Sequence, residues 1–143
     1  MAAYYQYKSY TFKQGDSHTI CCKVPSEINS GIRGIGVFGR TNALSAEIPE
    51  GITKIGDYCF WQSQISSVTI PSTVSEIGSQ AFFWCPNLES VTILATTPPL
   101  LGDYVFGDNK SGRKIYVPSE SVDAYKAAEG WSEYAADIMA IQS

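Results

Sequence analysis

The sequence repeats one pattern with a period in the low twenties. Gly56 and Gly78 lie 22 residues apart, and Gly78 and Gly102 lie 24 residues apart. A phenylalanine follows each of these glycines four residues later, and a short β-branched run closes each copy. A period of this length is typical of a solenoid and falls in the range of leucine-rich repeats.

Weaker copies extend the pattern toward the N-terminus. Val24 to Ile28 reads like Ile70 to Val74, and Ile35 to Phe38 reads like a shortened glycine-to-phenylalanine segment. We therefore expect about four coils between Val24 and Pro118.

Each copy combines a short strand with a tight turn that opens at the glycine. Neither element can bury its apolar side chains alone, so neighbouring coils must stack strand beside strand at about 4.8 Å. The expected strands are Val68 to Ile70, Val91 to Ile93 and Ile115 to Val117. Stacking predicts two inward columns, which are Phe60, Phe82 and Phe106, and Ile70, Ile93 and Val117. Proline supplies no amide hydrogen, so strands are expected to end at Pro49, Pro71 and Pro118.

Several short motifs recur at fixed places in the repeat. They are Ile70-Pro71, Ile77-Gly78, Ala81-Phe82, Cys85-Pro86-Asn87-Leu88 and Val91-Thr92-Ile93. This set resembles the BspA-like leucine-rich repeats of bacterial surface proteins. Thr97-Pro98-Pro99, Ile115 to Pro118 and Val122 to Trp131 are similar to the C-terminal close of such proteins in gut-type anaerobes. The resemblance implies an α+β repeat solenoid of right-handed leucine-rich-repeat-like coils with short parallel strands.

The two ends of a solenoid need covers, because open ends expose strand edges and core side chains. Residues 1–23 are expected to form an N-terminal cap or hairpin, residues 24–118 the solenoid, and residues 119–143 a C-terminal helical cap. In that cap, Ser119 or Ser121 is expected to begin a helix that ends near Gly130. The apolar spacing then continues through Trp131, Tyr134, Ala135 and Ile138.

Composition excludes some classes of partner. The chain has 143 residues, 44% of them hydrophobic, which suffices for one compact core. The formal charge is −4 and the ten basic residues are scattered, so a nucleic-acid partner is not expected. No apolar run reaches the length of a membrane span, and the first residues lack the pattern of a signal peptide. Because the resemblance implies an extracellular or cell-surface protein, we expect this chain to be a mature form or a piece of a longer protein.

Residues that could carry chemistry are few. His18 is the single histidine and has no motif around it, so we expect a surface residue rather than a catalytic one. The four cysteines lack the paired spacing of a zinc site, and no metal or cofactor is expected. Cys59 and Cys85 occupy different places in the coil, which disfavours a bridge between them, and we expect both as buried free thiols.

Two carboxylates share a position in the coil. Asp57 and Asp103 sit two coils apart, at a separation near that of an inverting glycosidase pair. Ser79 occupies the same position between them, and Asp and Ser both accept amide hydrogen bonds at turn starts. We favour this capping role over catalysis.

The candidate binding residues are aromatic. In the family pattern the two residues after the core phenylalanine face outward, which marks Trp61, Phe83 and Trp84. Exposed rings of this kind bind sugar rings or protein partners. The alternative is that they pack on one another or on the tyrosine-rich N-terminus. A second outward column on the strands is polar and consists of Glu47, Thr69, Thr92 and Tyr116.

These observations favour a non-enzymatic surface-binding solenoid. The resemblance implies attachment to a host matrix protein, to another cell-surface protein or to other cells. The alternative function is a glycan-binding or scaffolding accessory of a surface polysaccharide-utilisation system. An enzyme of the parallel β-helix type is disfavoured, because the sequence shows no cluster of acidic or basic catalytic groups.

Overall fold

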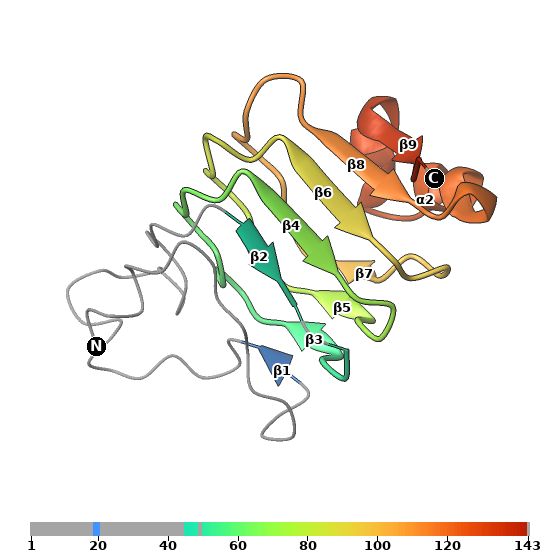
Figure 1. Cartoon of the computed structure of the whole chain (residues 1–143), viewed down its shortest axis with the longest axis horizontal. Coiled ribbons are helices and arrows are strands. Elements are labelled where there is room, and N and C mark those ends of the chain that lie inside the picture. The colour runs from blue at the N-terminus through green and yellow to red at the C-terminus, as the bar shows by residue number, and fades with distance from the viewer. Residues whose placement is uncertain (1–18, 21–44, 49, 143) are drawn as a thin grey trace.

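The chain winds through successive coils, each of which contributes a strand to each of two sheets (Figure 1). The structure is a computed structural model and describes residues 19–20, 45–48 and 50–142. Every strand pairing in both sheets is parallel. The observed architecture is therefore a repeat fold with short parallel strands.

The larger sheet has five strands in the order β2-β4-β6-β8-β9. Their bounds are Ser45–Glu47 for β2, Ser67–Ile70 for β4, Ser90–Ile93 for β6, Lys114–Val117 for β8 and Ile138–Ala140 for β9. In β4, β6 and β8, half-buried residues alternate with buried ones, so one row of side chains enters the core. Ile70 pairs with Ile93 as the sequence predicts, and Pro71 and Pro118 directly follow the ends of β4 and β8.

The smaller sheet has four two-residue strands in the order β1-β3-β5-β7. Their bounds are Thr19–Ile20 for β1, Lys54–Ile55 for β3, Glu76–Ile77 for β5 and Leu100–Leu101 for β7. Ile55 pairs with Ile77, and both side chains are fully buried. The second sheet thus closes the core from a second direction.

Tight turns form the third side of each coil, and their backbones also pair between coils. The amides of Tyr58, Phe60 and Gln62 donate to carbonyls of the next coil, at 3.0, 2.7 and 3.2 Å from the oxygens of Ser79, Ala81 and Phe83. The same pattern links that coil to the following one, from Gln80, Phe82 and Trp84 to Asp103, Val105 and Gly107. These hydrogen bonds satisfy turn amides that would otherwise lack a partner, and they join each turn to the turn of the next coil.

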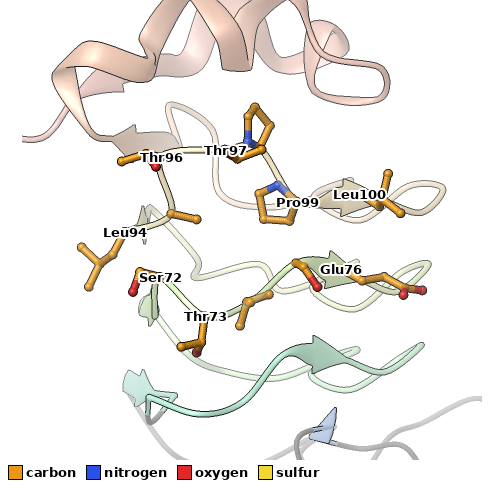
Figure 2. Close-up of a pocket in the computed structure, with 12 residues that line it drawn as sticks. Ser72, Thr73, Glu76, Leu94, Thr96, Thr97, Pro99 and Leu100 are labelled. Carbon is orange, nitrogen blue, oxygen red and sulfur yellow. The ribbon is translucent and has the colours of Figure 1, made fainter.

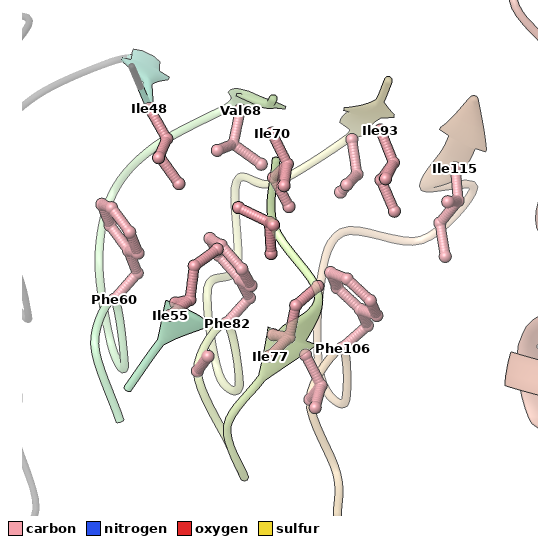
Figure 3. Close-up of a cluster of buried hydrophobic side chains, with 14 of the residues drawn as sticks. Ile48, Ile55, Phe60, Val68, Ile70, Ile77, Phe82, Ile93, Phe106 and Ile115 are labelled. Atoms are coloured by element: carbon pink, nitrogen blue, oxygen red, sulfur yellow. The ribbon is translucent and has the colours of Figure 1, made fainter. Parts of the chain in front are cut away.

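The predicted phenylalanine column is confirmed (Figure 3). The rings of Phe60 and Phe82 stack at 5.1 Å between centroids with 7° between their planes. Phe82 and Phe106 stack at 5.6 Å and 9°. All three side chains are buried, and isoleucines from both sheets surround them.

The repeat glycines are required by the close approach of neighbouring coils. A Cβ atom on Gly78 would collide with the Asp57 side chain and lie 2.6 Å from the Asp57 amide nitrogen. A Cβ atom on Gly102 would lie 2.5 Å from the Ser79 amide nitrogen. Because the obstructing atoms belong to the backbone, a larger residue at either place forces the coils apart.

The C-terminal region covers the last coil with several short elements instead of two long helical segments. They are the 3-10 helix η2 (Ser119–Ser121), the helix α2 (Val122–Ala127), the 3-10 helix η3 (Trp131–Asp137) and strand β9. Ser121 makes no side-chain cap; its hydroxyl donates instead to the Thr96 carbonyl at 2.7 Å. Ile138, predicted on a helix, lies in β9 and pairs with Ile115.

An ion pair also fastens this region to the solenoid. The Arg113 guanidinium donates to the Phe106 carbonyl at 2.6 Å and to the Asp137 carboxylate at 2.9 Å. It also lies 5.2 Å from the centre of the Tyr134 ring. Pairing of this cation with a carboxylate and a carbonyl offsets part of the cost of its removal from water.

One expectation about the cysteines is wrong. Cys59 is buried but disulfide-bonded, whereas Cys85 is a buried free thiol as predicted. Cys21 and Cys22 lie outside the described residues. Most of the predicted N-terminal hairpin, His18 and Pro49 also lie outside the described residues, where only Thr19–Ile20 is seen as strand β1.

Candidate binding surface

The three aromatic residues singled out from the sequence differ in exposure. Trp84 is 49% exposed, whereas Trp61 and Phe83 are half-buried. The Trp61 and Trp84 rings meet edge to face at 6.1 Å between centroids. Phe83 instead meets Tyr104, at 6.4 Å. Part of the alternative interpretation therefore holds, because these rings pack on one another.

Two tyrosines that the sequence analysis did not select complete this surface. Tyr58 lies 6.1 Å from Trp61, and Tyr104 is 68% exposed. Both residues stand two positions after a repeat glycine, so the repeat alignment contained the signal that would have identified them. We use the term aromatic surface for Tyr58, Trp61, Phe83, Trp84 and Tyr104.

Coil composition explains why Trp84 remains exposed. The Phe83 ring leans over the next coil, where a Cβ atom on Gly107 would come within 2.7 Å of it. Gly107 and Asp108 occupy the places in that coil that correspond to Phe83 and Trp84. With no large ring at either place, nothing aromatic from the next coil covers Trp84.

The backbone under the aromatic surface is left-handed at two recurring positions. Two residues after each glycine, the φ angles are 60° at Tyr58, 56° at Gln80 and 55° at Tyr104. Two residues after each core phenylalanine, they are 63° at Gln62, 59° at Trp84 and 52° at Asp108. Turns of this kind favour glycine or asparagine at these positions. Large rings at Tyr58, Trp84 and Tyr104 are therefore not what the backbone alone would select.

Planar polar side chains alternate with rings in these two columns. Gln80 lies between Tyr58 and Tyr104 in one column, and Gln62 and Asp108 flank Trp84 in the other. An amide or carboxylate beside an aromatic face offers hydrogen bonds next to a flat apolar area.

The second predicted column lies on the larger sheet in the expected register. Glu47 pairs with Thr69, Thr69 with Thr92 and Thr92 with Tyr116. Thr69, Thr92 and Tyr116 are half-buried, and Met139 of β9 extends the row. This face is flat and largely polar, as expected of a solvated sheet.

The carboxylate column has a structural role. The Oδ1 atom of Asp57 accepts a hydrogen bond from the Ser79 amide at 2.8 Å, and the Ser79 hydroxyl accepts one from the Asp103 amide at 3.0 Å. Each side chain thus caps the turn of the following coil. This engagement favours capping over a glycosidase pair.

Comparison with known proteins confirms the family resemblance. A family model described as a BspA type leucine rich repeat region matches residues 34–128 with six copies. No curated protein matches the sequence. Within the described ranges, no helix has the length and apolarity needed to cross a membrane.

Proposed function

The chain belongs to the BspA-type leucine-rich-repeat family, a type of interaction module, and from that premise we propose that it is a non-enzymatic binding module of the bacterial cell surface. Its role is to attach to a macromolecular partner outside the cell, and the aromatic surface is the contact. Recognition requires a rigid, repetitive face and no chemical step.

The observation that carries this proposal is the pair of exposed rings at Trp84 and Tyr104. Both stand on left-handed backbone, where a bulky residue costs about 1 kcal/mol. Trp84 remains 49% exposed and Tyr104 68% exposed, so much of each ring is left uncovered by its contact with Trp61 or Phe83. Residues that are unfavourable for the fold and remain exposed are best explained by a role in binding.

A protein partner, such as a host matrix or cell-surface protein, is the first choice. Tryptophan and tyrosine are enriched among the residues that dominate protein–protein binding energy. The half-buried Trp61 and Phe83 hold the neighbouring rings in place and so lower the entropy lost on binding.

A glycan is the second candidate partner, and one observation favours it. Gln62, Gln80 and Asp108 lie between the rings in the same two columns. Such alternation suits a sugar, which offers hydroxyl groups at its edge and an apolar face. A glycan-binding accessory of a polysaccharide-utilisation system would use the same surface.

The test replaces both exposed rings. Trp84→Ser combined with Tyr104→Ser should weaken binding to a panel of immobilised matrix proteins, or to a glycan array, by more than about tenfold, or about 1.4 kcal/mol. The melting temperature should stay near that of the parent, because exposed side chains contribute little to the core. Met139→Ser, which removes an exposed side chain on the larger sheet, is the matched control and should bind normally. Undiminished binding by the double variant would remove the aromatic surface from consideration.

A further inference from the structure

A hollow of about 550 Å³ separates the corners of two neighbouring coils. The lower corner is Ser72 to Glu76, which follows β4 and reaches the first residue of β5, and the upper corner is Leu94 to Leu100, which follows β6 and reaches the first residue of β7. Figure 2 shows the two corners facing each other below the C-terminal elements. We call this hollow the corner groove; it shares no residue with the aromatic surface.

The groove exists because the two corners differ in length and because the upper corner has fewer amide hydrogens to donate. Ile70 pairs with Ile93 and Glu76 pairs with Leu100, so the linking segment between these pairs is one residue longer above (94–99) than below (71–75). It also contains Pro98 and Pro99, which have no amide hydrogen to donate downward. The backbone ladder that joins the coils elsewhere is interrupted here.

Both walls of the groove are held in place from behind. Below, the Thr73 hydroxyl accepts a hydrogen bond from the Gly51 amide at 3.1 Å and donates to the Ile52 carbonyl at 2.7 Å. Above, the C-terminal elements bind three carbonyls of the upper corner. Tyr125 donates to Ala95 at 2.8 Å, Ser121 to Thr96 at 2.7 Å and Trp131 to Pro99 at 2.7 Å. The groove is therefore preformed and needs little ordering on binding.

The lining leaves backbone groups available. Among the described residues, no hydrogen bond reaches the carbonyl oxygens of Ser72, Thr73 and Val74, and none is made by the amides of Thr96 and Thr97. Rows of free acceptors and donors on neighbouring segments match the alternating amides and carbonyls of an extended polypeptide. Water satisfies these groups when the groove is empty.

The side chains at the two ends of the groove are aliphatic. Leu94 is 40% exposed and Leu100 is 73% exposed. Among the residues that the structure describes, no aromatic side chain lines the groove, whereas flat rings are what sugar binding favours. Exposed leucines beside free backbone groups suit apolar side chains of a peptide.

The charges that line the groove and its extension are acidic. A smaller hollow of about 170 Å³ adjoins it, shares Glu76 and Leu100, and adds Asp57. No basic residue lines either hollow in the described part of the chain. The Nζ atom of Lys54 lies 3.3 Å from the Oε2 atom of Glu76 in an exposed ion pair. Ion pairs of this type contribute little stability. A cationic ligand group can therefore compete for the Glu76 carboxylate.

We propose that the corner groove binds an extended peptide segment of a partner protein, in which a basic residue stands beside an apolar one. The peptide backbone pairs with the free groups of the two corners. Its apolar side chain contacts Leu94 or Leu100, and its basic side chain reaches Glu76. This site lies beyond the proposed function, because it is separate from the aromatic surface.

Backbone amide NMR shifts test the proposal with two blocked pentapeptides. The probe has the sequence Ala-Val-Lys-Leu-Ala, and its charge-reversed partner has Glu in place of Lys. Titration with the Lys peptide should move the amide signals of Ser72, Thr73, Thr96 and Thr97, and the Glu peptide should bind about threefold more weakly. Maltoheptaose should leave these signals unchanged.

Substitutions then locate the contacts. Leu94→Ser with Leu100→Ser should weaken the Lys peptide by about tenfold, and Glu76→Gln should remove the preference for Lys over Glu. Lys54→Gln should strengthen binding of the Lys peptide, because it frees the Glu76 carboxylate. Met139→Ser and Trp84→Ser are matched controls and should bind as the parent does. Absence of shifts with both peptides, equal affinity for both in the parent, or a response to maltoheptaose alone would each overturn the proposal.

Discussion

The thiol of Cys85 donates a hydrogen bond to the carbonyl of Phe60 in the preceding coil, with 3.1 Å between sulfur and oxygen. The relationship recurs one coil later, where the Asn109 amide nitrogen donates to the Phe82 carbonyl at 2.9 Å. In the last coil, the Arg113 guanidinium donates a hydrogen bond to the Phe106 carbonyl. Each core phenylalanine thus presents a carbonyl that a polar residue outside the strands satisfies, which explains a free cysteine in the core.

The first prediction concerns this donor. Cys85→Ala should lower the free energy of unfolding by about 1–3 kcal/mol, because it removes a buried hydrogen bond and leaves a small cavity. Cys85→Ser keeps a donor of similar size and should cost less. Urea unfolding measures both. Equal stability of the Ala variant and the parent would show that the thiol acts only as filler.

The second prediction concerns the oxidation states of the cysteines. Burial raises the pKa of the Cys85 thiol to about 12, although nearby amides of Ser63 and Gln62 partly oppose the rise. Iodoacetamide should therefore modify Cys85 very slowly in the native protein and readily in urea, because only the thiolate reacts. In non-reducing urea Cys59 should stay unmodified until a reductant is added. Peptide mass mapping reads both sites, and alkylation of Cys59 without reductant would contradict the disulfide.

The third prediction tests the phenylalanine column. Phe82 lies between two stacked rings and is fully buried, so Phe82→Ala should cost about 3–5 kcal/mol. Phe83→Ala removes the same number of atoms from a half-buried ring and should cost clearly less. Thermal and urea unfolding compare the two variants. A Phe82→Ala melting curve that matches the parent would refute the stacked core.

Much of this core was accessible from sequence because the coils are in register. Once Gly56, Gly78 and Gly102 are aligned, the phenylalanine column and the strand columns follow from stacking alone. The aromatic surface followed only in part. The alignment assigned Trp61, Phe83 and Trp84 to the outside, but only Trp84 is exposed, because the burial of the other two depends on neighbouring rings and on Gly107.

The other departures arise where the repeat breaks. The disulfide of Cys59 needs a partner other than Cys85, so spacing within the coils could not reveal it. The apolar spacing that ends at Ile138 favours a helix, but β8 would then expose an unpaired strand edge. Pairing with that edge outweighs the helical spacing, and the segment forms strand β9. The corner groove has a sequence signal in the longer interval from Gly78 to Gly102 together with Pro98-Pro99.

The fourth prediction concerns alkaline pH. Burial raises the pKa of the Tyr125 hydroxyl well above its usual value. A folded-state pKa above the unfolded one gives stability that is full below about pH 10 and is lost as the pH rises through the folded-state pKa. The free energy of unfolding should therefore fall above about pH 10, and less steeply in Tyr125→Phe. At neutral pH that variant should lose about 1 kcal/mol with its hydrogen bond to Ala95.

Urea unfolding between neutral pH and pH 11 measures this dependence. Cys85 contributes in the same direction from a slightly lower pH, so the comparison is best made in a Cys85→Ser background. The exposed Tyr104→Phe is the control and should keep the parent slope. Parallel curves for Tyr125→Phe and its background would show that the buried hydroxyl does not set the alkaline limit.

The last prediction separates backbone cost from binding at Tyr104. The φ angle there is 55°, a conformation that asparagine tolerates and a β-branched residue resists. Tyr104→Asn should therefore leave the free energy of unfolding unchanged or raise it by up to about 1 kcal/mol, whereas Tyr104→Val should lower it. Both variants lose the same ring contact with Phe83, so the difference between them reports how well each residue type tolerates this backbone conformation. If the tyrosine is retained for a partner, both should bind it less well, and the Asn variant would combine higher stability with weaker binding. A Val variant as stable as the Asn variant would instead show that the backbone imposes no such cost, and the main argument for a binding role of this residue would be lost.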